Sequence, residues 1–184
     1  MQSYLFLILQ VLLCIAESVG KLGPPGGPLK LNHDVVDTYK VYQNFPYVVS
    51  AADSDNNTIY ECMTAKRTAF NPTKKTATFS LILQEPGSEP REPIKLHQRV
   101  GDEPETFIFW TDEDPSPKEG RFYYTDYHDC VILDLEYAGH QCTLWVQRNL
   151  AGPLSQECID HFEDACGIPV PPHPRQACDD FSLK

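Results

Sequence analysis

The sequence predicts a mainly β protein, in which eight antiparallel strands form an up-and-down barrel between a short N-terminal helix and a C-terminal helix packed outside. One observation is a series of short segments over residues 45–145 in which apolar and polar side chains alternate. Another is the turn-forming residues that separate these segments at nearly even spacing, with almost no helix between them. Eight strands can close a barrel around a packed core or one small ligand. An immunoglobulin-like sandwich is the alternative, but the Cys…Trp…Cys arrangement is absent and the late helix fits it poorly.

The first 20 residues have the pattern of a secretory signal peptide. Residues 2–16 carry no charge and are dominated by Leu, Ile and Val, and small residues suited to cleavage are present at 17–20. The apolar stretch is too short to span a bilayer comfortably, so we expect a secreted protein; a buried N-terminal helix is the alternative. Residues 21–32 are rich in Gly and Pro and predict a flexible arm. Residues 33–184 would form a single domain.

A short helix is predicted at 34–42. Asp34 can cap its amino end, and Asp37 would interact favourably with the helix dipole in the first turn. Its buried face would consist of Val36, Tyr39 and Val41.

Six strands are predicted after this helix, at 45–51, 58–70, 76–84, 94–100, 105–111 and 121–127. In the third of them Ala77, Phe79, Leu81 and Leu83 share one face. In the fifth, Phe107 and Phe109 share a face that we expect to be the inner one. In the sixth, the alternation places Phe122 and Tyr124 inside, with Arg121 and Tyr123 outside.

Residues 130–145 predict the last two strands, joined as a hairpin. From 130 to 137 every second residue is apolar, and 138–140 can close a three-residue loop in which Gly139 supplies the positive φ. With this turn, the thiols of Cys130 and Cys142 share the outer face. The inner face would carry Val131, Leu133, Thr143 and Trp145.

The helix predicted after the hairpin is capped by Ser155 and ends at Gly167. Cys158 and Cys166 lie on one face of it, about 12 Å apart. The two outward thiols of the hairpin can meet them if the helix lies obliquely across the strands. We therefore predict the disulfides Cys130–Cys158 and Cys142–Cys166.

A third disulfide follows from the number of cysteines. Cys14 leaves with the signal peptide, and the remaining even number suits an oxidising compartment. The last pair is Cys62–Cys178, which would tie the C-terminal tail to the second strand. Closing so long a loop is worth roughly 4–5 kcal/mol by chain entropy.

Composition excludes several classes of function. The net charge of −11 argues against nucleic acid and anionic membrane as partners, since both need basic surfaces. The sequence contains no C-x-x-C pair and no Cys/His arrangement typical of a zinc site, and its histidines do not have the spacing of metal ligands, so we expect no metal site. No nucleophile stands in a motif with a base, so we expect no catalysis and no cofactor. Asn56 begins a sequon for N-glycosylation, which suits a secreted protein.

A particular order of cysteines and their neighbours extends over essentially the whole mature chain. It consists of Ile59-Tyr60-Glu61-Cys62, Asp129-Cys130-Val131-Ile132, Thr143-Leu144-Trp145, a helix with Cys158, and Cys178 near the C-terminus. In this the chain resembles the tick salivary lipocalins, also called the tick histamine-binding protein family. The resemblance implies a lipocalin barrel with the pairs Cys62–Cys178 and Cys130–Cys158, to which Cys142–Cys166 would be an addition.

The resemblance also implies the function. Such proteins are secreted and sequester a small host mediator in the barrel, which contributes to evasion of host inflammation. The implied ligand is a biogenic amine, histamine or serotonin. The alternatives are a lipid mediator (leukotriene, sterol or fatty acid), or a host plasma protein such as a complement component bound through the loops. We expect a monomer.

The predicted ligand site lies on the inner face of the barrel. It comprises Phe107, Phe109, Phe122, Tyr124, Val131, Thr143 and Trp145, with Glu92 matching one of the inward acids of the family. A buried ammonium needs a paired charge and gains from ring faces. However, Val131 and Thr143 stand where amine-binding members tend to carry acids. An aromatic interior with few acids suits a lipid or a neutral ring better than a dication, and plain core packing is the alternative role for the aromatic residues.

Overall fold

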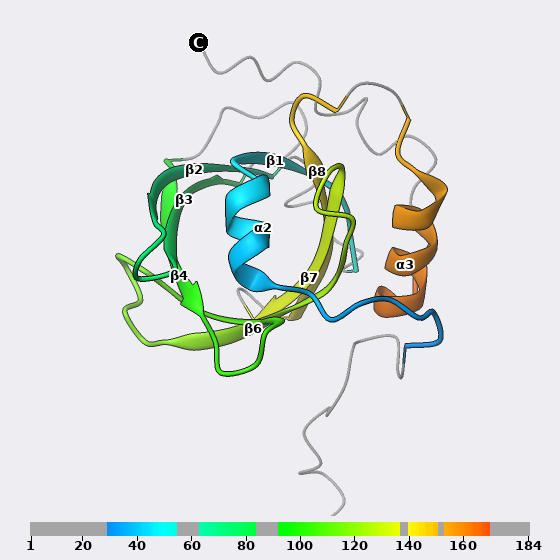
Figure 1. Ribbon diagram of the computed structural model, residues 1–184. Coiled ribbons are helices and arrows are strands. Elements are labelled where there is room, and N and C mark those ends of the chain that lie inside the picture. Colours follow the sequence, from blue (N-terminus) through cyan, green and yellow to red (C-terminus); the bar gives the residue numbers. More distant parts are fainter. Residues whose placement is uncertain (1–28, 55–62, 84–91, 137–139, 151–152, 170–184) are drawn as a thin grey trace, which may run out of the picture.

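The computed structural model describes residues 29–54, 63–83, 92–136, 140–150 and 153–169 (Figure 1). The strands are β1 (Tyr47–Asp53), β2 (Thr64–Asn71), β3 (Thr76–Ile82), β4 (Ile94–Val100), β5 (Thr106–Thr111), β6 (Lys118–Thr125), β7 (Cys130–Glu136) and β8 (His140–Gln147). The helices are α2 (Thr38–Asn44) and α3 (Gln156–Cys166). The signal peptide, Asn56, Cys62, Cys178 and the tip of the last hairpin lie outside the described residues.

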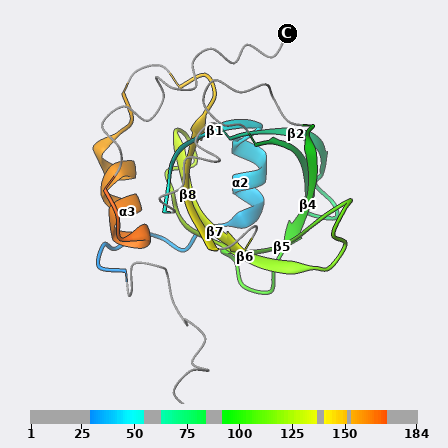
Figure 2. The same ribbon diagram turned by 180° about the vertical axis from the view of Figure 1, so that it is seen from behind.

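The eight strands form a closed antiparallel barrel in sequence order, and β1 pairs with β8 to complete it. This confirms the predicted mainly β, eight-stranded antiparallel up-and-down barrel. Figures 1 and 2 view the barrel from opposite ends: α2 lies across one end, and α3 lies outside, beside β7 and β8. Neither described helix has the length and hydrophobicity that crossing a membrane would require.

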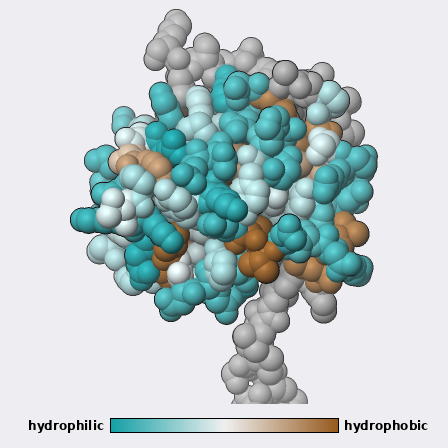
Figure 3. All heavy atoms as spheres, viewed as in Figure 1, coloured by the Kyte–Doolittle hydropathy of each residue, from teal (hydrophilic) through white to brown (hydrophobic). Residues whose placement is uncertain are grey.

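Alternation along the strands separates two apolar cores. The inward residues of β3, Ala77, Phe79 and Leu81, are buried inside the barrel, as predicted, together with Leu83 directly after the strand. The outward residues of the last hairpin, such as Ile132 and Leu144, pack outside the barrel with α3. We call the cluster inside the barrel the inner core and the cluster beneath α3 the outer core. Figure 3 shows that hydrophilic side chains cover most of the face that carries α2. The apolar interior is therefore shielded by α2 on this side.

Helix α2 begins later than the sequence predicted. Its cap is Asp37, whose carboxylate accepts hydrogen bonds from the backbone N–H groups of Tyr39 (2.9 Å) and Lys40 (3.2 Å). The prediction of Asp34 as the cap is therefore wrong. Consequently the helix buries Thr38, Val41 and Tyr42, whereas Val36 is buried before the helix starts and Tyr39 is only partly buried.

Hydrogen bonds to the β4–β5 turn hold α2 across the end of the barrel. The backbone N–H of Thr38 donates to the carbonyl of Pro104 (2.9 Å), and its hydroxyl donates to the carbonyl of Thr106 (3.1 Å). On the other side, the guanidinium of Arg67 in β2 donates to the carbonyl of Tyr42. The helix is thus tied to two parts of the rim, and we call this end of the barrel the closed end.

Strand β6 contains the second departure from the predicted pattern. Its register shifts between Phe122 and Tyr124, so the strict alternation of faces is interrupted there. Phe122 lies inside the barrel, but Tyr123 and Tyr124 both belong to the outer core. The prediction that Tyr124 faces the interior is wrong, because a β-bulge cannot be read from the period of two.

Helix α3 and its disulfides agree with the prediction. The Ser155 hydroxyl accepts a hydrogen bond from the backbone N–H of Cys158, and Gly167 ends the helix with a φ of 74°. Cys130 is paired with Cys158 and Cys142 with Cys166, with Cα–Cα distances of 6.3 and 5.7 Å. Both predicted pairs are confirmed.

The residues before α2 run past α3. The backbone N–H groups of Lys30 and Leu31 donate to one carboxylate oxygen of Asp164 in α3, at 2.8 and 2.9 Å. The described part of the predicted arm is therefore attached to the helix outside the barrel.

Candidate binding cavity

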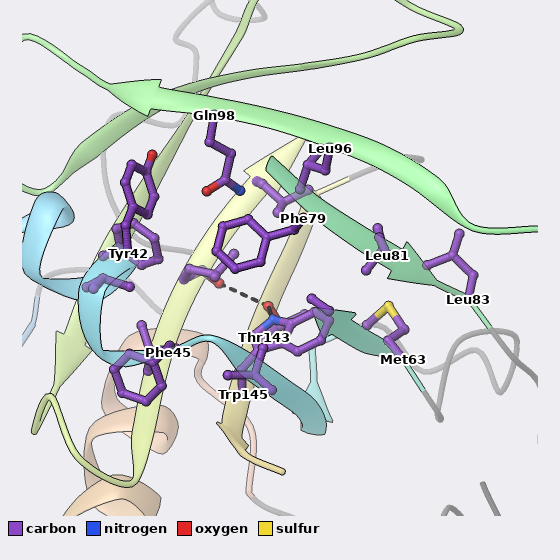
Figure 4. A pocket seen from close by; sticks show the side chains of 17 residues that line it. Tyr42, Phe45, Met63, Phe79, Leu81, Leu83, Leu96, Gln98, Thr143 and Trp145 are labelled. Carbon is purple, nitrogen blue, oxygen red and sulfur yellow. Dashed lines mark hydrogen bonds between the residues drawn. The ribbon is translucent and has the colours of Figure 1, made fainter. Parts of the chain in front are cut away.

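The barrel encloses a cavity of about 90 Å³ (Figure 4). Most of its wall is made by inward residues of the strands, and α2 contributes Val41 and Tyr42 with Phe45 directly after it. The strand residues and those next to them are Val48, Met63, Ala65, Phe79, Leu81, Leu83, Leu96, Gln98, Phe122, Val131, Leu133, Leu135, Thr143 and Trp145. The cavity thus lies within the inner core. We call the part of its wall formed by Val41, Tyr42 and Phe45, at the end that α2 covers, the floor.

The strand directions give the cavity two ends. β4 runs toward α2, so Gln98, near the end of that strand, lies deep. β3 runs the other way, so Leu83, directly after that strand, lies at the opposite end of the barrel. We call the end with Leu83 the mouth, since α2 covers the other.

Two of the polar groups in the wall satisfy one another. The indole Nε1–H of Trp145 donates to the hydroxyl oxygen of Thr143 at 2.7 Å, and the hydroxyl of Thr143 in turn donates to the carbonyl of Leu133 at 3.5 Å. Figure 4 shows Thr143 and Trp145 side by side. Both side chains are buried, so the pairing removes the desolvation penalty that each polar group would otherwise carry. Thr143 and Trp145 therefore act as an apolar surface toward a guest.

Two other polar groups have no such pairing. The hydroxyl of Tyr42 is fully buried and has no hydrogen-bond partner among the described residues, and burial raises the pKa of this phenol far above its usual range. Gln98 is 7% exposed, and no described residue forms a hydrogen bond with its amide. Both groups are neutral, so neither brings charge into the cavity.

No Asp, Glu, Lys or Arg belongs to the described wall of the cavity. Among the acids of the last hairpin, Glu136 is exposed and Asp134 stands between the inward residues Leu133 and Leu135. A charged ligand would therefore find no counter-ion in the described wall.

The predicted site residues fall into three groups. Phe122, Val131, Thr143 and Trp145 line the cavity. Phe107 and Phe109 belong to the inner core but not to the wall; the ring centre of Phe107 lies 4.7 Å from that of Phe122 and 6.0 Å from that of Phe109. Phe107 also packs over Gly120, where a Cβ would lie 2.3 Å from its ring. Tyr124 lies outside the barrel, and Glu92 is exposed before β4.

The prediction did not include the residues of the floor or the deepest polar group. Tyr42 and Phe45 line the cavity only because α2 folds across the end of the barrel, which no local pattern indicates. Gln98 could have been found: it is two residues after Leu96 and therefore on the same inward face, where a polar residue is unusual.

Comparison with known proteins identifies the family. Among solved structures, lobster apocrustacyanin A1 is 14% identical, with 80% of this chain and 87% of that chain covered and a TM-score of 0.49, a likeness too weak to bear on function. No curated protein gives a significant match. The family model described as tick histamine binding protein matches residues 31–171. Because this match extends over most of the sequence, the chain belongs to the tick histamine-binding protein family.

Proposed function

We propose that this protein sequesters a small, uncharged and mainly apolar molecule inside its barrel, without catalysis. The observation that carries the proposal is the described wall of the cavity, which is apolar except for a few neutral groups. Pockets for small molecules are concave and mostly apolar, with a small number of polar groups that fix orientation. This cavity has that composition.

The volume limits the size of the guest. A cavity of roughly 150 Å³ lined by apolar side chains admits benzene, and this one measures about 90 Å³. A molecule of one ring therefore needs a small displacement of side chains. Leukotrienes and sterols are much larger and would require the barrel to open further, so we place them after ring-sized compounds.

Histamine or serotonin is the second candidate, and the family match favours it. A buried ammonium without a carboxylate loses several kcal/mol of hydration free energy that the described wall cannot replace. Glu92, the acid that the sequence suggested for this role, is exposed and outside the wall. The described lining thus supports a neutral guest over a cation.

The proposed setting is extracellular. The two disulfides suit an oxidising compartment, and a signal peptide at 1–20, glycosylation at Asn56 and the pair Cys62–Cys178 are predictions consistent with it. By sequestering a host mediator the protein would reduce inflammation, which is the role that the family implies. A plasma protein bound at the loops is the other partner to test.

Three compounds of nearly equal size test the proposal: ethylbenzene, benzyl alcohol and benzylamine, which end in a methyl, a hydroxyl and an ammonium group. We expect at least one of the neutral compounds, ethylbenzene and benzyl alcohol, to bind at one site per chain. Benzylamine and histamine should bind at least tenfold more weakly than the better of these two. The two tryptophans supply the readout by NMR. The indole signal of Trp145 in the cavity should shift, and that of Trp110, which stacks on His97 away from the cavity, should not.

Matched variants locate the site. Ala65→Phe places a ring in the cavity and should abolish binding, whereas Ala69→Phe places it on the exposed face of the same strand and should not. Tighter binding of benzylamine or histamine than of ethylbenzene would establish the amine instead. Binding of none of the compounds would refute sequestration of ring-sized guests in the barrel.

A further inference from the structure

We infer that Gln98 is a specificity residue, which selects guests whose deep end carries an uncharged group able to donate and accept a hydrogen bond, such as a hydroxyl or a primary amide. This inference rests on the proposed function, since it describes how the guest lies in the cavity. It assigns to the closed end of the barrel a polar subsite that the apolar wall alone would not suggest.

The surroundings of Gln98 leave its amide without a partner among the described residues. Its neighbours across the two adjoining strands are Ala77 in β3 and Phe109 in β5, which are 3% and 1% exposed. Neither side chain can form a hydrogen bond. Gln98 as a whole is only 7% exposed, yet its amide is not among the fully buried polar groups, so the amide keeps a small exposed area. Because Gln98 lines the cavity, a guest there could pair with the amide, and a guest that covers the amide without pairing would be penalised.

The direction of the amide points to a guest. Gln98 lines the cavity, and Figure 4 shows its side chain reaching from β4 in among the other lining side chains. The amide carries an N–H donor and a carbonyl acceptor side by side. A hydroxyl or an amide on the guest can engage both, whereas a hydrocarbon that displaces cavity water leaves both unpaired.

The position of Gln98 also gives the guest an orientation. The β4–β5 turn that follows this strand is the one whose Pro104 carbonyl holds Thr38 of α2. The polar group of the guest would therefore lie near the floor, and its apolar part would lie toward Leu83 at the mouth. We expect a guest to enter with its polar group first.

The charge of the guest's polar group is also restricted. The amide oxygen can accept from an ammonium, but no carboxylate in the described wall compensates the buried charge. The hydroxyl of Tyr42 stays protonated at any physiological pH, because burial raises its pKa. The subsite is therefore suited to a neutral group.

The test compares ratios of affinities instead of single affinities, since benzyl alcohol and ethylbenzene differ in their own hydration. In the full chain, the ratio of the Kd of ethylbenzene to that of benzyl alcohol is measured by calorimetry for the unmodified protein and for Gln98→Leu. We expect this ratio to fall about two- to tenfold in the variant, the effect of one net hydrogen bond. The side-chain NH2 signals of Gln98 should shift with benzyl alcohol and shift less with ethylbenzene.

Leu96→Met is the matched control, because Leu96 lines the cavity on the same strand and carries no polar group. Its ratio should equal that of the unmodified protein. An unchanged ratio in Gln98→Leu, with both compounds still bound, would overturn the role of Gln98 and leave the proposed function intact. Failure of both compounds to bind the unmodified protein would overturn the proposed function and this inference with it.

Discussion

Gln98 and Thr143 are buried polar residues of the same wall in opposite situations. The hydroxyl of Thr143 accepts the indole N–H of Trp145, whereas no described residue pairs with the amide of Gln98. Removing a paired group leaves its partner unsatisfied, but removing an unpaired one relieves a penalty. The two residues should therefore respond differently to apolar substitution.

Thr143→Val should lower the free energy of unfolding by about 1–3 kcal/mol, because the buried N–H of Trp145 loses its acceptor. Gln98→Leu should leave it unchanged or raise it by about 1 kcal/mol. Urea denaturation in the absence of a guest measures both. A large loss of stability in Gln98→Leu would show that the amide stabilises the barrel itself and is not kept free for a guest.

His161 gives the protein a dependence on pH. Its ring in α3 is 7% exposed and stacks on Tyr124, with the ring centres 3.7 Å apart. His33 meets both rings edge-on, at 5.5 Å from His161 and 6.0 Å from Tyr124. Burial lowers the pKa of His161, the nearby His33 lowers it further, and Glu157, Asp160 and Asp164 oppose this.

A histidine whose pKa is lower in the folded state than in the unfolded state makes the protein less stable in acid. As the pH falls, His161 takes up a proton in the unfolded chain at a higher pH than in the folded protein. The free energy of unfolding is therefore largest above about pH 6.5 and decreases as the pH falls from there through the folded pKa. We expect the Tm to decrease less between pH 7 and pH 5 in His161→Phe, which keeps a ring against Tyr124. His128→Phe is the control, since the side chain of His128 is 86% exposed. Equal slopes in all three proteins would contradict this explanation.

Single residues also show where the sequence was sufficient. Phe122, Val131, Thr143 and Trp145 were placed in the interior from alternation alone, and all four line the cavity. Tyr124 was misplaced because the bulge in β6 reverses the faces after Phe122. A bulge depends on the partner strand, so its position is not contained in the pattern of one segment.

The two helices differ in how much of them the sequence determines. Both ends of α3 carry a local signal, Ser155 and Gly167, and both cysteines on its inner face have a partner in the hairpin. At the start of α2 the sequence predicted Asp34 as the cap and Asp37 in the first turn, whereas Asp37 is the cap. The choice depends on the contacts of Thr38 with the β4–β5 turn, which are distant in sequence.

The disulfides of α3 should stabilise the barrel without affecting the cavity. No residue of α3 lines the described wall, and the helix packs on the outer core. The pair Cys142–Cys166 closes a loop with a sequence separation of 24, which corresponds to about 3.5 kcal/mol of chain entropy.

The double variant Cys142→Ala/Cys166→Ala should therefore lose up to about 3.5 kcal/mol in urea denaturation. Binding of benzyl alcohol should be unchanged under conditions where the variant is folded. Loss of binding in a folded variant would mean that α3 contributes to the shape of the cavity. The double variant is used because a single substitution would leave a free thiol.

For the molecule as a whole, the sequence predicted the architecture better than the site. Eight alternating segments and the cysteine spacing were enough for the closed barrel and the helix outside it. The size of the cavity and its floor were not predictable, because they depend on how α2 lies across the barrel and on how far Phe107 and Phe109 fill the interior. Packing of side chains from distant segments decides whether aromatic residues form a wall or a solid core.

The complete molecule combines a cavity without charge in its described wall with a polar group at the closed end. Its family is described by histamine binding, but the described residues of this member provide no counter-ion for a cation inside the barrel. For this reason we expect a neutral guest to bind more tightly than an amine.

The most direct measurement is the set of intermolecular NOEs between the protein and bound benzyl alcohol. For a neutral guest inside the barrel, we expect contacts from the ring protons to Leu81, Leu133 and Trp145, and from the CH2OH group to Gln98. NOEs from benzyl alcohol only to residues of the outer face, for example Trp110, would contradict a neutral guest inside the barrel. So would the absence of any NOE from benzyl alcohol in a protein that does bind an amine.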